Sequence, residues 1–135
     1  MRAGGINWLA ALVAAIAIYA VGFVIYGVLV DENAWMAAQE LTEADLVASS
    51  AARMPFSALM PLATAFGMAV LFKWGNVQTL ADGAKWGAVI AVASAIPACW
   101  YGWVYGVGPA WLTMLDSGHL LLGHVVAGAI LGRWK

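Results

Sequence analysis

The sequence predicts an all-α integral membrane protein built from four transmembrane helices. Its composition is 64% hydrophobic and only 10% charged, with a mean hydropathy of +0.87, whereas a soluble domain carries about 25% charged residues. A small globular protein has a large surface relative to its volume, and so few charged side chains cannot cover it. The chain is therefore expected to be surrounded by lipid. Four long apolar segments and an uneven distribution of basic residues point the same way.

Each apolar segment reaches the length of about 20 residues that a helix needs to cross a bilayer. The segments cover residues 6–30, 54–74, 85–107 and 110–134 of a single domain, 1–135. The first is longer than the apolar part of a secretory signal peptide, so we expect a span there. Pro61 and Pro97 lie inside spans and each is predicted to kink its helix.

The long connection, residues 31–53, holds five of the seven acidic residues. The stretch Ala34–Glu40 favours a short helix at the periplasmic membrane interface. Thr42-Glu43-Ala44-Asp45 resembles a capping box, which predicts a second helix that begins at Glu43 and leads toward the second span.

The basic residues predict the orientation of the chain. With the N-terminus inside, five of the six face the cytoplasm, as the positive-inside rule requires. These five are Arg2, Lys73, Lys85, Arg133 and Lys135. Only Arg53 lies on the periplasmic side. We therefore expect an inner-membrane protein with both termini in the cytoplasm.

Tryptophan residues near the ends of the spans are predicted to anchor the helices, because indole favours the membrane interface. The anchors are Trp8, Trp35, Trp74, Trp86, Trp111 and Trp134. The two halves also resemble each other. Trp8 and Tyr26 in the first span match Trp86 and Tyr105 in the third. This match predicts two parallel copies of one hairpin, with coincidence among interfacial residues as the alternative.

Small residues recur at a spacing of four in the third and fourth spans, where they permit close approach of helix backbones. They are Gly83, Gly87, Ala91, Gly128 and Gly132. We expect these residues to pack the bundle, while a homodimer interface and a contact with a larger complex remain alternatives.

Ionisable groups inside a membrane are candidate functional groups. His124 lies near the middle of the fourth span, where we expect a neutral imidazole that is hydrogen-bonded to another helix, relays a proton, or ligates a haem or pigment metal. His119 and Asp116 share one face near its periplasmic end, as a cation or proton site or as a solvated cap. His119 and His124 lie about 140° apart around the helix, so we expect no joint metal site. Cys99 is interpreted as a small packing residue.

The sequence shows no nucleophile–base pair, phosphate-binding loop or metal-ligand cluster, and its net charge of −1 offers no basic patch for nucleic acid. We therefore expect no enzyme, no nucleic-acid partner and no cofactor, apart from the haem or pigment alternative at His124. The predicted role is an accessory or structural subunit that contacts the lipid bilayer and either another membrane protein or a second copy of itself. A small ion or solute transporter or channel that uses Asp116, His119 and His124 is the alternative.

Short motifs along nearly the whole chain resemble the bacterial membrane family known as domain of unknown function 1761. They are Ile6-Asn7-Trp8-Leu9-Ala10, Tyr26-Gly27, Ala34-Trp35-Met36, Leu41-Thr42-Glu43-Ala44-Asp45-Leu46, Gly83 with Gly87, Gly118-His119-Leu120 and Gly128-Ala129-Ile130-Leu131-Gly132. The resemblance implies four helices in a bacterial inner membrane and implies no activity. The chain departs from the family pattern at Asp31-Glu32-Asn33 and at His124.

Overall fold

The computed structural model describes residues 2–134, and of Arg2 and Ala3 it describes the main chain alone. Four helices in this part are long and apolar enough to cross a membrane: Trp8–Leu29, Glu43–Trp74, Leu80–Tyr105 and Ala110–Arg133. The predicted all-helical fold with four membrane-length helices is thereby confirmed. Lys135, which we expect to face the cytoplasm, lies outside the described residues, as does the side chain of Arg2.

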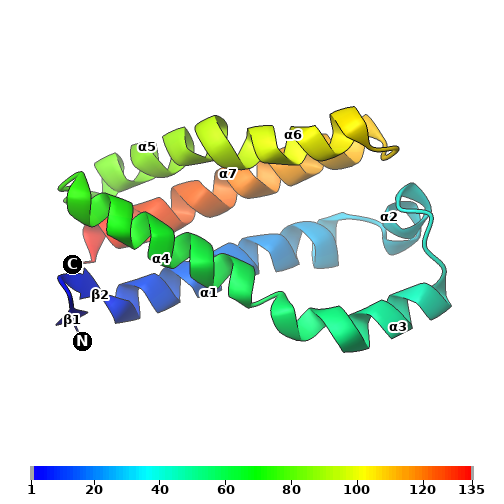
Figure 1. Ribbon diagram of the computed structural model, residues 1–135, viewed down its shortest axis with the longest axis horizontal. Coiled ribbons are helices and arrows are strands. Elements are labelled where there is room, and N and C mark those ends of the chain that lie inside the picture. Colours follow the sequence, from blue (N-terminus) through cyan, green and yellow to red (C-terminus); the bar gives the residue numbers. More distant parts are fainter. Residues whose placement is uncertain (1, 135) are drawn as a thin grey trace.

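Figure 1 shows the long helices side by side, with both chain ends together at one end of the bundle. We call this end the terminal end. The elements in order are β1 (Arg2–Ala3), β2 (Ile6–Asn7), α1 (Trp8–Val24), η1 (Ile25–Leu29), α2 (Glu32–Ala38), α3 (Glu43–Arg53), η2 (Met54–Phe56), α4 (Leu59–Trp74), α5 (Leu80–Ile90), η3 (Ala91–Ala95), α6 (Ile96–Tyr105) and α7 (Ala110–Arg133). Helices α5 and α6 form one continuous rod through η3.

The first helix begins at Trp8, not at residue 6 as the apolar pattern predicts. Strands β1 and β2 pair antiparallel around Gly4 and Gly5, whose φ angles of 61° and 77° suit a tight hairpin turn. The side chain of Asn7 then accepts a hydrogen bond from the backbone N–H of Ala10, at 3.2 Å, and caps α1. Hydropathy alone therefore does not locate this boundary.

The third span begins at Leu80, five residues before the predicted start. The Thr79 hydroxyl accepts a hydrogen bond from the backbone N–H of Asp82 at 3.0 Å and donates one to its carboxylate at 2.7 Å. This capping arrangement satisfies an otherwise free N–H at the helix start. The polar residues near Asp82 hide the start of the span from a hydropathy-based reading.

Both prolines lie in the first turn of a helical element, and the kinks expected at them stay a prediction. Pro61 lies in the first turn of α4, where a missing N–H costs little, and the chain breaks earlier, at η2. Pro97 lies in the first turn of α6, directly after the π-helical segment η3. A π turn shifts the hydrogen-bond ladder by one residue. It thereby accommodates the missing proline N–H while the rod α5–η3–α6 continues.

The closest contact in the fold joins α5 to α7 through glycine backbones. A Cβ atom on Gly83 would overlap the carbonyl oxygen of Gly128, and one on Gly87 would overlap that of His124. A Cβ atom on Gly132 would overlap the carbonyl oxygen of Thr79 and would also lie against the main chain of Gly83. Ala91 is buried next to this row, at 0% exposure. All five small residues of the predicted packing set therefore lie at the α5–η3 interface with α7 or beside it.

The opposite side of α7 packs on α1, and α1 packs in turn on α4. The core between these three helices consists mainly of small side chains. Its buried members are Ala10, Ala11, Ala14, Ala15, Ile18, Ala65, Met68, Ala69, Phe72, Val77, Ala127 and Leu131. Because alanine allows backbones to approach, three helices come together with few large residues between them.

We predict that Gly128→Ala lowers the free energy of unfolding by about 1–3 kcal/mol, because two backbones must separate to admit one methyl group. Gly118→Ala, also in α7, is the matched control, since nothing lies within 4 Å of its added Cβ. Unfolding in mixed detergent micelles measures both changes. Equal stability of the two variants would contradict the close contact.

Candidate functional site

A groove separates α1–η1 from α3 and α4, and α7 forms its floor. In Figure 1 the chain changes direction between α3 and α4, so α3 diverges from the bundle that α4 joins. The groove has a volume of about 680 Å³. Its polar and aromatic lining includes Tyr19, Phe23, Tyr26, Glu32, Trp35, Ser57, Thr64, His119 and His124. Two of the three predicted polar residues, His119 and His124, therefore border one groove.

His124 is 7% exposed, and its Nδ1 lies 2.7 Å from the carbonyl oxygen of Leu120. Both residues belong to α7. Nδ1 therefore makes a hydrogen bond within its own helix and not to another helix, as was predicted for His124. Because a carbonyl oxygen only accepts, Nδ1 carries the proton. In the neutral imidazole, Nε2 is then an acceptor.

His119 lies where α7 crosses α1. Its ring meets the ring of Tyr26 edge to face, with 5.4 Å between centroids and 90° between planes. It also reaches the main chain of Ile18. Gly22 makes room for it, since a Cβ there would lie 3.0 Å from Nε2 of His119. The imidazole is thus held between aromatic and backbone contacts.

Asp116 receives donors from two other helices. The Tyr26 hydroxyl donates to one of its carboxylate oxygens, and the Cys99 thiol donates to the other at 3.9 Å. Tyr26 belongs to η1, a π-helical segment, and Cys99 belongs to α6. A carboxylate in a membrane needs such donors. Asp116 therefore joins the first, third and fourth spans at one point.

The sequence analysis matched Tyr26 with Tyr105 and interpreted Cys99 as a packing residue, so it missed both partners of Asp116. A second pair lies beside them: Trp100 Nε1 donates to the Ser117 hydroxyl at 2.9 Å, and that hydroxyl donates to the Thr113 carbonyl at 2.7 Å. We call Tyr26, Cys99, Trp100, Asp116 and Ser117 the outer polar cluster. The sequence did contain one indication of these partners. A carboxylate inside a membrane, such as Asp116, needs a hydrogen-bond donor from a neighbouring span, and Tyr26 carries a hydroxyl group.

Within residues 2–134, no group of three or more His, Cys, Asp and Glu side chains is placed to hold a metal ion. A single haem or pigment ligand at His124 stays a prediction. The bond from Nδ1 to a carbonyl leaves Nε2 as the nitrogen that would bind, an orientation common among metal-ligating histidines.

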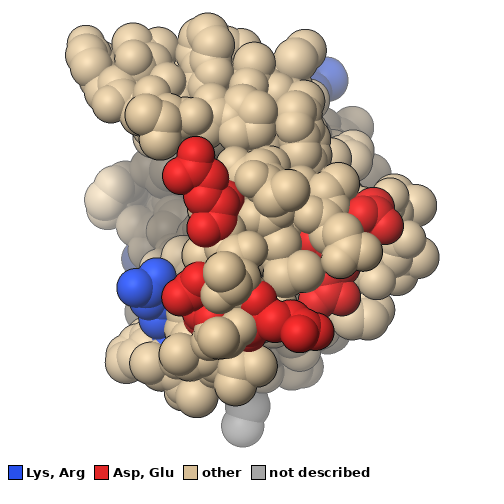
Figure 2. Space-filling view, turned by 90° about the vertical axis from the view of Figure 1, so that its right-hand side faces the viewer, with Lys and Arg blue, Asp and Glu red and all other residues tan. Residues whose placement is uncertain are grey.

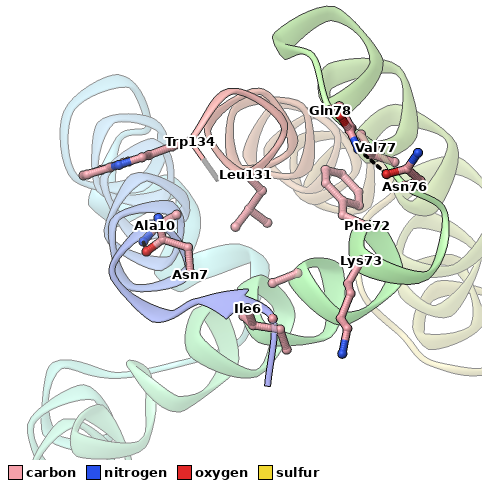
Figure 3. Close-up of a pocket in the computed structure, with 12 residues that line it drawn as sticks. Ile6, Asn7, Ala10, Phe72, Lys73, Asn76, Val77, Gln78, Leu131 and Trp134 are labelled. Carbon is pink, nitrogen blue, oxygen red and sulfur yellow. Dashed lines mark hydrogen bonds between the residues drawn. The ribbon is translucent and has the colours of Figure 1, made fainter. Parts of the chain in front are cut away.

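A smaller hollow of about 220 Å³ lies at the terminal end, between α1, α4 and α7 (Figure 3). Its polar side chains already have partners. Gln78 donates to Asn76, and Lys73 Nζ donates to the Gly4 carbonyl at 2.6 Å. Trp134 borders this hollow. Of the other predicted anchors, Trp8, Trp74 and Trp86 lie in the parts of α1, α4 and α5 near this end, and Trp35 and Trp111 lie in α2 and the first turn of α7.

Figure 2 shows the end opposite the termini, where acidic side chains gather around α2 and the start of α3. We call it the acidic end. Its exposed carboxylates are Asp31, Glu32, Glu40, Glu43 and Asp45. Asp45 and Thr42 form the predicted capping box at the start of α3. The two ends of the bundle therefore differ in charge, and the groove lies nearer the acidic end because Glu32 borders it.

We predict that Tyr26→Phe lowers the free energy of unfolding by about 1–3 kcal/mol, because it leaves the Asp116 carboxylate without its hydroxyl donor. In a double-mutant cycle with Asp116→Asn, the two changes are expected to be strongly non-additive. Tyr105→Phe, at a side chain that is 81% exposed, is the control. Additive effects of the Tyr26 and Asp116 changes would contradict the coupling.

Comparison with known proteins gives the chain a family and no activity. Residues 9–132 match the family model described as "Protein of unknown function (DUF1761)". None of the curated proteins and none of the solved structures compared with the chain matches it. The match covers nearly all of the four membrane-length helices and the acidic connection between the first two. The chain therefore belongs to the DUF1761 family, as its motifs suggested.

Proposed function

We propose that this protein is a non-catalytic membrane subunit that binds another membrane protein or a second copy of itself. The observation that carries the proposal is a pair of small residues on each of two outward helix faces. Ala63 and Gly67 are exposed on α4, and Ala98 and Gly102 are exposed on α6. Nothing lies within 4 Å of a Cβ placed on Gly67 or Gly102.

Such pairs favour helix association in lipid. Lipid chains are as apolar as leucine, so burial of apolar surface drives helices together only weakly there. Close backbone packing through small residues four apart is the usual alternative. The bundle uses this device internally, where Gly83 and Gly87 meet α7. The two outer pairs offer the same geometry to a helix from another chain.

We predict that Gly67→Leu and Gly102→Leu abolish self-association or co-purification of a partner while the bundle stays folded. Gly118→Leu is the matched control, because its Cβ also has nothing within 4 Å but Gly118 belongs to neither pair. Cross-linking in native membranes and size measurement in mild detergent give the readout. A wild-type protein that is a free monomer without a partner would contradict the proposal.

We further propose that the protein lies in a bacterial inner membrane with both termini in the cytoplasm, and that α2 is a periplasmic interfacial helix. The charge difference between the two ends supports this orientation. The side chains of Lys73, Lys85 and Arg133 are exposed at the terminal end, and basic residues favour the cytoplasmic side. In α2, Trp35 is half-buried, as an interfacial aromatic residue would be.

The orientation predicts the side from which introduced cysteines react. In a Cys99→Ser background, Glu43→Cys is expected to react with a membrane-impermeant maleimide added to intact spheroplasts. Gln78→Cys, at a residue that is also exposed but lies at the terminal end, is expected to react only after lysis. The reverse labelling pattern would show that the termini lie outside.

The duplicated hairpin stays a proposal of the same kind. Trp8 and Trp86 both lie toward the terminal end, while Tyr26 and Tyr105 both lie toward the other, as two parallel copies require. The π-helical segments η1 and η3 do not occupy matching positions in the two copies. Any duplication has therefore been followed by local change in the helix ladder.

A small ion or solute transporter is the second candidate, and the groove is the observation that favours it. His119 and His124 border the groove, and Asp116 is connected to it through Tyr26. Ion flux in proteoliposomes is the direct measurement. Flux that is unchanged in His119→Leu and His124→Leu would contradict a path through these residues.

A further inference from the structure

We propose that the groove between α1, α4 and α7 binds a lipid-soluble phenol, whose hydroxyl donates a hydrogen bond to Nε2 of His124. The proposal is independent of the accessory role, because none of the residues that line the groove belongs to the small-residue pairs on the outward faces of α4 and α6. Three properties of the groove support it: an acceptor without a partner, an aromatic lining and a neutral interior.

The acceptor is Nε2 of His124. The side chain is more than nine-tenths buried and borders the groove. Its Nδ1 is committed to the Leu120 carbonyl, so Nε2 carries the lone pair. None of the described residues donates a hydrogen bond to Nε2. Among the described residues, every buried side-chain nitrogen or oxygen that is closed off from solvent has a hydrogen-bond partner. Nε2, which has none, is therefore not closed off. Nε2 therefore opens into the groove, where an O–H donor would complete its bonding.

The lining favours a ring. Tyr19, Phe23, Tyr26 and Trp35 contribute aromatic surface, and aromatic pairs prefer each other beyond the area they bury. The volume of about 680 Å³ falls within the range of about 300–1,000 Å³ typical of small-molecule sites. A substituted phenol with an alkyl tail fits both the size and the chemistry.

The electrostatics favour a neutral ligand. Glu32 is the one charged side chain that borders the groove among the described residues, and it is exposed. The hydroxyl of Tyr26 is already committed to Asp116, and His119 is held by Tyr26 and Ile18. The groove near His124 therefore has a free acceptor and no free charge. A cation or anion would lose its hydration there without a partner.

Two probes that differ by one donor test the proposal. The purified protein in nanodiscs of saturated phosphatidylcholine is titrated with 4-nonylphenol and with its methyl ether, 4-nonylanisole, by isothermal calorimetry. Protein-free nanodiscs supply the partitioning baseline. The phenol is expected to bind roughly tenfold more tightly than the ether, because only the phenol donates to Nε2. Equal affinities in the unaltered protein would overturn the proposal and would indicate a groove that takes any acyl or alkyl chain.

Variants locate the site. His124→Leu is expected to remove the tenfold preference while the ether still binds, which also reports that the groove is intact. Thr64→Phe fills the groove from α4 and is expected to abolish binding of both probes. Leu59→Phe, at an exposed α4 residue outside the groove lining, is the matched control and is expected to bind normally. A phenol preference that persists in His124→Leu, or binding that persists in Thr64→Phe, would overturn the proposal.

Discussion

The direct contact between the backbones of α5 and α7 is the constraint on which the rest of the bundle depends. Gly83 and Gly128 lack the Cβ atoms that would hold the two helices apart, so α7 lies against α5 along its inner face. Its opposite face is then free to meet α1, where Gly123 admits the side chain of Ile18. In a bilayer, where apolar burial is weak as a driving force, this shape complementarity determines the arrangement of helices.

The polar groups are placed by that arrangement. Because α7 lies between α5–α6 and α1, its Asp116 can receive donors from both sides, namely Tyr26 and Cys99. His119 rests on Gly22 for the same reason. Tyr26 belongs to both regions: its hydroxyl faces the outer polar cluster, and its ring borders the groove. The side chain of Tyr26 therefore links the half-buried Asp116 carboxylate to the groove beside it.

Hydropathy and small-residue spacing predicted the number of spans and the residues at the α5–α7 contact, because both follow from the solvent and from local periodicity. Helix boundaries were predicted less well, since Thr79 and Asn7 define them through single hydrogen bonds within polar stretches. The partners of Asp116 were missed, because they depend on which helices are neighbours and on their rotation. The groove was missed too, since the divergence of α3 at η2 is a property of three-dimensional packing.

The π-helical segment η1 gives the first span one residue more than a regular helix of the same rise would hold. Such a segment behaves as an insertion that the helix has absorbed. Loss of Ile25 would move the tyrosine back by one position and turn its side chain by about 100° around the helix axis relative to α1. Tyr26 would then no longer reach both Asp116 and the groove. The exact number of residues in this span therefore matters. A relative with a regular helix here would have one residue fewer than this chain.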